Sequence, residues 1–180
     1  MSVKERTVDF LDLKKLVRDI PDFPKEGIVF KDITPLLKDR LAFQQVVNHF
    51  TSIFKSEKID QVVGIESRGF ILSAVLAYQL GAGFVPVRKQ GKLPSTTESV
   101  IYQLEYGTDI LEVHQDAIQK GDRVVVVDDL LATGGTCDAT IQLVERLGGK
   151  IIGLAFLIEL SFLNGRARLQ KYPLHSLIQY

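Results

Sequence analysis

Hydrophobic runs and amphipathic stretches alternate along most of this chain. The runs are short and rich in β-branched residues, which is typical of strands buried on both faces of a parallel sheet. They lie at residues 62–65, 84–87, 123–127 and 151–158. Elsewhere apolar residues recur at spacings of three and four, which predicts helices with one buried face. These helices are expected at residues 43–54, 70–80 and 136–147, and Asp39 is placed to cap the first of them. The alternation predicts an α/β fold, a mainly parallel sheet flanked by helices.

The N-terminal part of the chain precedes this alternation and follows a different pattern. Apolar residues recur at helical spacing over 10–20 and Pro21 ends the pattern, so we predict a helix there. A turn-rich segment and a short apolar run at 28–30 come next. We therefore predict a single domain spanning the whole chain, with a helix and a small hood in residues 1–35 and an α/β core in residues 36–180.

One connection does not fit the alternation. Residues 89–108 are too numerous and too polar for an ordinary link between elements, and loops of this length are usually functional or disordered. We predict a flexible lid loop at about 93–108. Pro86, in the strand just before it, favours a place at a sheet edge or a strand end, because proline has no N–H to donate.

Composition excludes several classes of protein. The 180 residues are 46 % hydrophobic and 24 % charged, which is enough for one hydrophobic core. Lys plus Arg and Asp plus Glu both number 22, so no overall positive field is available to hold a nucleic acid. The single cysteine, Cys137, excludes an internal disulfide. No apolar run is long enough for a membrane span and no signal-peptide pattern is present, so we expect a cytoplasmic protein without a nucleic-acid or membrane partner.

The strongest chemical signal follows the run at 123–127. Asp128 and Asp129 end the predicted strand, and a loop of small residues at 132–136, Ala-Thr-Gly-Gly-Thr, opens the next helix. Ligands in open α/β sheets bind at the carboxyl ends of strands, and free N–H groups at a helix N-terminus bind anions. The loop has no lysine, which excludes a Walker loop, and the dinucleotide fingerprint is missing. A plain strand-to-helix turn with solvated acids is the alternative, but a phosphate site beside two carboxylates suits a phosphorylated sugar.

This stretch resembles the 5-phosphoribosyl-1-pyrophosphate (PRPP) motif of the type I phosphoribosyltransferases. Four further segments, in the same order along the chain, resemble the adenine-specific members of that family. They lie at residues 22–33, 66–70, 88–94 and 104–107, and the likeness runs from about residue 20 to the C-terminus. The resemblance implies the type I phosphoribosyltransferase fold, transfer of the phosphoribosyl group from PRPP to adenine in purine salvage, Mg²⁺ as cofactor and a homodimer. Transfer to another base, or a regulator that binds PRPP without catalysis, are the alternatives.

The same resemblance implies the roles of individual residues toward PRPP. The catalytic residues would be Glu105, which faces the purine and assists proton movement, together with Arg68 and Asp128. No protein side chain would be a metal ligand, because Mg²⁺ would be carried mainly by PRPP and water. Without the resemblance, the basic residues Arg68, Lys89 and Lys92 would be interpreted as part of a solvent-exposed charged face. The residues expected to bind PRPP are Ser67, Arg68, Arg88, Lys89, Lys92, Tyr106, Asp128, Asp129, Ala132, Thr133, Gly134, Gly135 and Thr136.

The base would be held by the hood and by the residue after the two acids. The resemblance implies that Phe30 stacks on adenine, that backbone groups at Val29 and Lys31 read its amino edge, and that Leu130 packs on its other face. A 6-oxopurine presents the opposite donor and acceptor pattern and would leave these backbone groups unpaired. Taken from the pattern alone, Phe30 would be an ordinary core residue. Arg88 would assist from its own or the neighbouring subunit.

Overall fold

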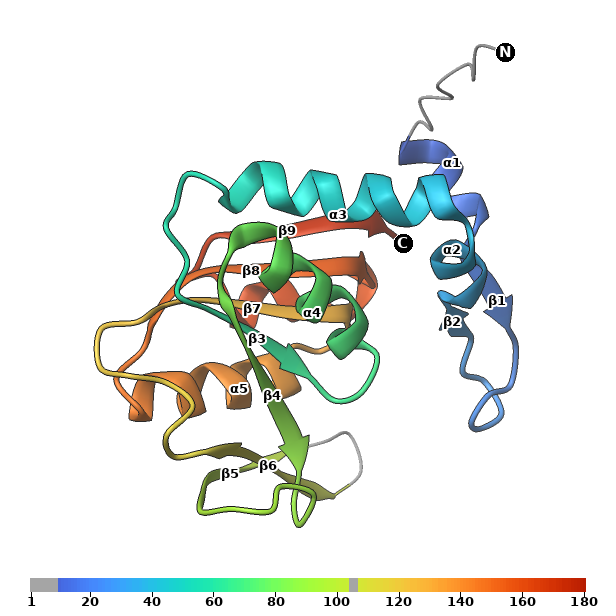
Figure 1. The fold of residues 1–180 in the computed structure, drawn as a ribbon. Helices are drawn as coiled ribbons and strands as arrows, with labels where there is room; N and C mark the ends of the chain where they lie inside the picture. The colour runs from blue at the N-terminus through green and yellow to red at the C-terminus, as the bar shows by residue number, and fades with distance from the viewer. Residues whose placement is uncertain (1–9, 104–106) are drawn as a thin grey trace. The chain divides into compact units, whose positions relative to one another are not determined.

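The computed structural model describes residues 10–103 and 107–180, and the chain divides into two compact units, Met1–His49 and Phe50–Tyr180 (Figure 1). The division falls within helix α3, Arg40–Phe54. Asp39 caps this helix as predicted, because its Oδ1 accepts hydrogen bonds from the backbone N–H groups of Leu41 and Ala42 at 3.0 and 2.9 Å.

The N-terminal unit holds two short helices and a two-stranded antiparallel sheet. Its elements before α3 are α1 (Phe10–Lys15), β1 (Arg18–Ile20), β2 (Phe30–Asp32) and α2 (Thr34–Lys38). The predicted helix over 10–20 is therefore wrong beyond Lys15. The reason is a long-range one: Arg18 pairs with Asp32 in register across the two strands, and their side chains lie 3.7 Å apart. Local spacing alone does not reveal that partner.

The second unit is built on a seven-stranded sheet, which confirms the predicted α/β fold. The strand order is β5-β6-β4-β3-β7-β8-β9, and all neighbours from β4 to β9 in this order are parallel. The hairpin of β5 and β6 is antiparallel, as is the pairing of β6 with β4. The strands are β3 (Gln61–Ile65), β4 (Gly83–Lys89), β5 (Thr97–Gln103), β6 (Thr108–His114), β7 (Arg123–Leu131), β8 (Lys150–Glu159) and β9 (Leu174–Gln179).

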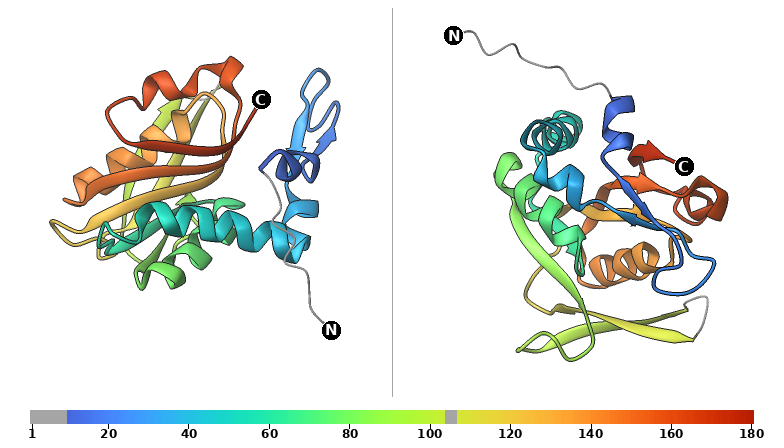
Figure 2. Two further views of the ribbon diagram at one scale, coloured as in Figure 1. Left: turned by 90° about the horizontal axis from the view of Figure 1, so that it is seen from above. Right: turned by 90° about the vertical axis from the view of Figure 1, so that its right-hand side faces the viewer.

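Helices cover the two faces of this sheet. Helix α4 (Gly69–Leu80) lies against one face and α5 (Gly135–Arg146) against the other (Figure 2). Val63 of β3 belongs to the core cluster that includes α5 residues. Its neighbour Gly64 faces α4, where an added Cβ would collide with Ser73 Oγ. Strands β3, β7 and β8 are largely buried on both faces, which explains their continuous apolar runs.

The segment predicted to be a flexible lid loop contains a strand. Residues Thr97–Gln103 form strand β5, paired in register with β6, so these residues of the predicted lid are a strand and not a loop. Val100, 4 % exposed, is the apolar anchor that the polar sequence concealed. Pro86 does not mark an edge strand, since β4 lies between β3 and β6. The register with β6 begins only at Arg88, so no partner on that side needs the missing N–H.

Two short helices follow β8. They are the 3₁₀-helix η1 (Ser161–Leu163) and α6 (Gly165–Arg168), which precede β9. In the described part of the chain, none of the helices combines the length and the apolar character needed to span a bilayer.

Candidate functional site

The loop after β7 forms the centre of the candidate site. Strand β7 runs through both acids to Leu131, further than predicted, and α5 begins at Gly135. Gly134 precedes the helix with a φ of 80°, a left-handed conformation that favours glycine. The N-cap residue is a glycine and makes no side-chain hydrogen bond to the first N–H groups of α5, which can therefore bind an anion.

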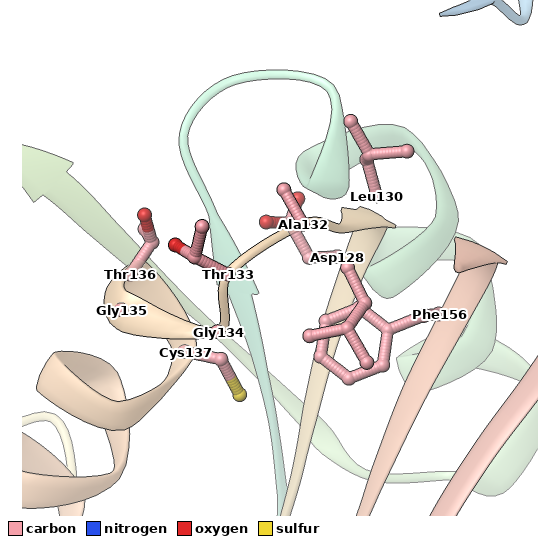
Figure 3. A pocket seen from close by; sticks show the side chains of 10 residues that line it. Asp128, Leu130, Ala132, Thr133, Gly134, Gly135, Thr136, Cys137 and Phe156 are labelled. Carbon is pink, nitrogen blue, oxygen red and sulfur yellow. The ribbon is translucent and has the colours of Figure 1, made fainter. Parts of the chain in front are cut away.

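A pocket of roughly 300 Å³, open to solvent, lies at this loop (Figure 3). The hydroxyl groups of Thr133 and Thr136 project from one side of the loop, whereas the sulfur of Cys137 points the opposite way. Seven of the predicted site residues therefore gather at one place. The residues that line the pocket are Asp128, Leu130, Leu131, Ala132, Thr133, Gly134, Gly135, Thr136, Cys137 and Phe156.

The two adjacent acids have different surroundings. Asp128 lines the pocket and its Oδ1 accepts a hydrogen bond of 2.9 Å from the backbone N–H of Asp129. Asp129 is only 4 % exposed, does not line the pocket, and contacts Arg68 Nη2 through Oδ2 at 2.9 Å. Burial, together with the negative charge of Asp129, raises the pKa of Asp128 well above its ordinary value. Burial also raises the pKa of Asp129, while Arg68 acts to lower it.

The loop after β3 brings the second group of predicted residues. Ser67 and Arg68 connect β3 to α4, and the peptide bond between Glu66 and Ser67 is cis. Helix α4 begins at Gly69, where an added Cβ would lie 2.7 Å from Asp128 Oδ1. Glycine therefore permits the close approach between this loop and the acids of β7.

A carboxylate holds three of the predicted basic residues beside this loop. Glu66 accepts hydrogen bonds from Lys92 Nζ and, at 2.9 Å, from the backbone N–H of Lys89, and Arg88 Nε lies 3.5 Å away. Burial acts to raise the pKa of Glu66, but the bonds from Lys92 and Lys89 outweigh it and lower the pKa. Lys89 Nζ pairs with Asp109 of β6 at 3.0 Å. Glu66 and Asp109 were not predicted as site residues.

The β5–β6 hairpin approaches the loop from another side. The carbonyl oxygen of Gln103 lies 3.3 Å from the position that a Cβ on Gly135 would take. The Tyr102 hydroxyl is hydrogen-bonded to the side chain of Thr136, and burial raises the pKa of this tyrosine. Glu105 and Tyr106, the next predicted residues along the chain, lie outside the described residues.

The predicted hood residues belong to the N-terminal unit, whereas Leu130 belongs to the other. Val29 is 49 % exposed, and Phe30 makes an edge-to-face contact with Phe23 at a centroid distance of 5.2 Å. Lys31 Nζ is paired with Asp19 across the β1–β2 sheet at 2.7 Å. Its side chain is thus committed to the sheet, which leaves its backbone as the predicted contact to a base.

Comparison with known proteins identifies relatives of this chain. The phosphoribosyl transferase domain matches residues 36–175. An adenine phosphoribosyltransferase of Thermotoga petrophila is 55 % identical over 170 residues, which cover 94 % of this chain and 100 % of the relative.

Solved structures agree with the sequence comparison. A crystal structure of adenine phosphoribosyltransferase from Rhodothermus marinus has a TM-score of 0.92 and 54 % identity, covering 95 % of this chain and 98 % of that one. The Saccharomyces cerevisiae enzyme, solved with an imino-altritol bisphosphate and adenine, has a TM-score of 0.87 and 42 % identity, with coverages of 93 % and 97 %. The likeness in sequence and in fold extends over nearly the whole chain, and the chain belongs to the phosphoribosyltransferase family.

Proposed function

We propose that this protein transfers the 5-phosphoribosyl group of PRPP to adenine, giving AMP and pyrophosphate in purine salvage. The observation that carries the proposal is the likeness to adenine phosphoribosyltransferases over 94 % of the chain. The pocket supports it, because an anion-binding loop and a carboxylate lie together at the end of β7. These are the groups that a phosphorylated ribose requires.

The phosphoribosyl part of PRPP binds along the pocket. Backbone N–H groups at the start of α5 and the hydroxyls of Thr133 and Thr136 hold the 5-phosphate. Asp128 accepts hydrogen bonds from the ribose hydroxyls. Asp129 acts indirectly, because its contact with Arg68 holds the loop after β3 in place.

The pyrophosphate is bound at the loop after β3. Ser67 contributes its backbone, and Arg68 brings a charge that Asp129 holds in place at 2.9 Å. Lys89 and Lys92 supply two further cations, which Asp109 and Glu66 hold in this structure. Arg88 and Tyr106 assist. Positive charge at this place stabilises the charge that develops on the departing pyrophosphate.

Breakage of the bond at C1′ runs ahead of attack by adenine N9, so positive charge develops on the sugar. Phe30 stacks on the base, backbone groups of Val29 and Lys31 read its amino edge, and Leu130 packs on its other face. Glu105 assists proton movement on the purine. Closure of the hairpin segment over the site excludes water that would otherwise capture the sugar.

The residues at the pocket fit the Mg²⁺ that this chemistry uses. Mg²⁺ prefers oxygen ligands and keeps several of its waters, often with one or two carboxylates and substrate phosphates. Asp128 offers such a carboxylate at the pocket. No group of three or more His, Cys, Asp or Glu side chains with a metal-binding arrangement occurs within residues 10–103 and 107–180. When bound, the ion supplies positive charge to the pyrophosphate, carried mainly by PRPP and water and held near Asp128.

An assay that compares purine bases as acceptors tests the proposal. With PRPP and Mg²⁺, adenine is expected to react with a kcat/KM at least about 10³-fold above those of hypoxanthine and guanine, because these bases leave buried groups unpaired. Comparable values for guanine would favour another base, and binding of PRPP without turnover of any base would favour a regulator.

We further propose a cytoplasmic homodimer. Sedimentation at micromolar concentration that gives only a species near the 20.1 kDa of one chain would contradict the dimer.

A further inference from the structure

Helix α6 packs directly against the backbone of the phosphate-binding loop. A Cβ on Gly165 would collide with the carbonyl oxygen of Ala132 and would lie 3.0 Å from the backbone nitrogen of Gly134. In the other direction, a Cβ on Gly134 would lie 2.9 Å from the carbonyl oxygen of Gly165. The two backbones therefore touch without intervening side chains, and this contact fixes the position of the later α6 residues relative to the loop.

This packing places the guanidinium of Arg168 at the start of α5. Arg168 Nη1 lies 3.1 Å from the position that a Cβ on Gly135 would take, on the first residue of that helix. Arg168 is exposed, and none of the described carboxylates lies within ion-pair distance of it. The neighbouring arginine differs, since Arg166 is held by Glu159 through two hydrogen bonds of 3.0 and 2.6 Å.

A cation at this place is unfavourable unless an anion joins it. The N-terminal end of a helix carries partial positive charge, so an unpaired guanidinium there is repelled. The loop itself has no cationic side chain to pair with a phosphate dianion, because residues 130–137 contain neither lysine nor arginine. An anion bound by the N–H groups of α5 would remove the repulsion and gain a charge-assisted contact.

We propose that Arg168 is a further binding residue for PRPP and supplies the positive charge for its 5-phosphate. The inference rests on the proposed function, because it takes PRPP as the ligand of this loop. The planar guanidinium presents several donors to phosphate oxygens, which lysine does not match. Arg168 acts on substrate binding, and the base and the proton transfers lie elsewhere.

Steady-state kinetics of Arg168→Gln test this role. The KM for PRPP is expected to rise about 10-fold, which is the loss of binding expected when one charge-assisted hydrogen bond at an exposed site is removed. The KM for adenine should change by no more than about twofold. Arg168→Lys should fall between Arg168→Gln and the wild type. The matched control is Lys150→Gln, which removes the same charge at the exposed amino end of β8, whereas the loop follows the carboxyl end of the neighbouring strand β7. It should leave both KM values unchanged.

Calorimetric titration with ribose 5-phosphate separates this inference from the proposed function. The wild type should bind it about 10-fold more tightly than Arg168→Gln, while the melting temperatures of the two free proteins agree within about 2 °C. If the wild type fails to convert adenine, the proposed function falls, and the titration still decides the role of Arg168. Equal affinities, no binding by the wild type, or a rise in both KM values with a lower melting temperature would overturn the inference.

Discussion

Asp128 and Asp129 allow a matched test, because the same change at adjacent positions should have different effects. Asp128→Asn removes a negative charge but keeps an oxygen that can accept the 2.9 Å hydrogen bond from the backbone N–H of residue 129. Asp129→Asn also removes a buried charge, but it takes the partner from Arg68, which stands 2.9 Å away. The structure thus predicts that the first change stabilises the free protein more than the second.

The size of the difference follows from these contacts. Relief of an uncompensated carboxylate at a binding site typically raises the free energy of unfolding by about 0.5–2 kcal/mol, which we expect for Asp128→Asn. For Asp129→Asn the loss of the Arg68 contact should cancel about 1 kcal/mol of a similar gain, since Arg68 is partly exposed. Function should move the other way: Asp128→Asn loses a charged acceptor for ribose, worth roughly 1.5–3 kcal/mol, so its KM for PRPP rises about 10- to 100-fold.

The stability difference between Asp128→Asn and the wild type should depend on pH. Because the pKa of Asp128 is raised in the folded protein, the unfolded chain loses its proton first as the pH rises from the ordinary value of 3.8. Folding then takes up a proton, so the stability of the wild type falls through this window and levels off above the folded pKa. The stability advantage of Asp128→Asn should therefore be near zero at pH 4 and grow toward neutrality.

Chemical denaturation at a series of pH values, in the absence of PRPP and Mg²⁺, measures this advantage, and initial rates at neutral pH measure the KM. An advantage that does not change between pH 4 and pH 7 would refute the electrostatic reasoning. A destabilised Asp128→Asn with an unchanged KM for PRPP would refute the assignment of this residue to the ligand.

Three further predictions concern the surroundings of the site. Gly165→Ala should lower the free energy of unfolding by about 1–3 kcal/mol and raise the KM for PRPP, because the added methyl group displaces the phosphate-binding loop; denaturation and kinetics check it. Tyr172→Phe loses a 2.7 Å hydrogen bond to Glu145, worth about 0.5–1.5 kcal/mol. The pKa of Tyr172 is raised to about 12, so this contribution should disappear as the pH rises from about 10 to about 12. Glu66, whose pKa is lowered, should stabilise the protein above its ordinary pKa of 4.5 and lose that effect in acid, and Glu66→Gln should lack this acid-sensitive component in a pH series of denaturation curves.

The sheet and the phosphate-binding loop could be predicted because their signals are local. The runs at β3, β7 and β8 are apolar on both faces, so their sequences indicate buried strands. The residues of the loop after β7 are contiguous, so the sequence motif is enough to identify it. Strand β5 gives no such signal, because Ile101 is 68 % exposed and most of its other residues are polar. It becomes a strand through pairing with β6 and contact with α5, which depend on residues later in the chain.

Ion pairs around the site were beyond prediction for the same reason. Lys92 and Glu66 are 26 residues apart, and neither shows its partner in the local pattern. The resemblance implied that Lys92 binds PRPP, and the structure adds that the carboxylate of Glu66 pairs with this lysine. In the proposed function, PRPP competes with Glu66 for this lysine.

The different surroundings of Asp128 and Asp129 did have a signal in the sequence. Side chains of consecutive residues on a strand point to opposite faces, so two adjacent acids on β7 cannot both face one pocket. The prediction that both acids bind PRPP came from the resemblance to the phosphoribosyltransferase motif, without regard to this alternation. Because β7 continues to Leu131, the alternation applies: Asp128 reaches the pocket and Asp129 turns to Arg68 on the next loop. Asp128 therefore lies at the pocket, and Asp129 connects the loops after β7 and β3.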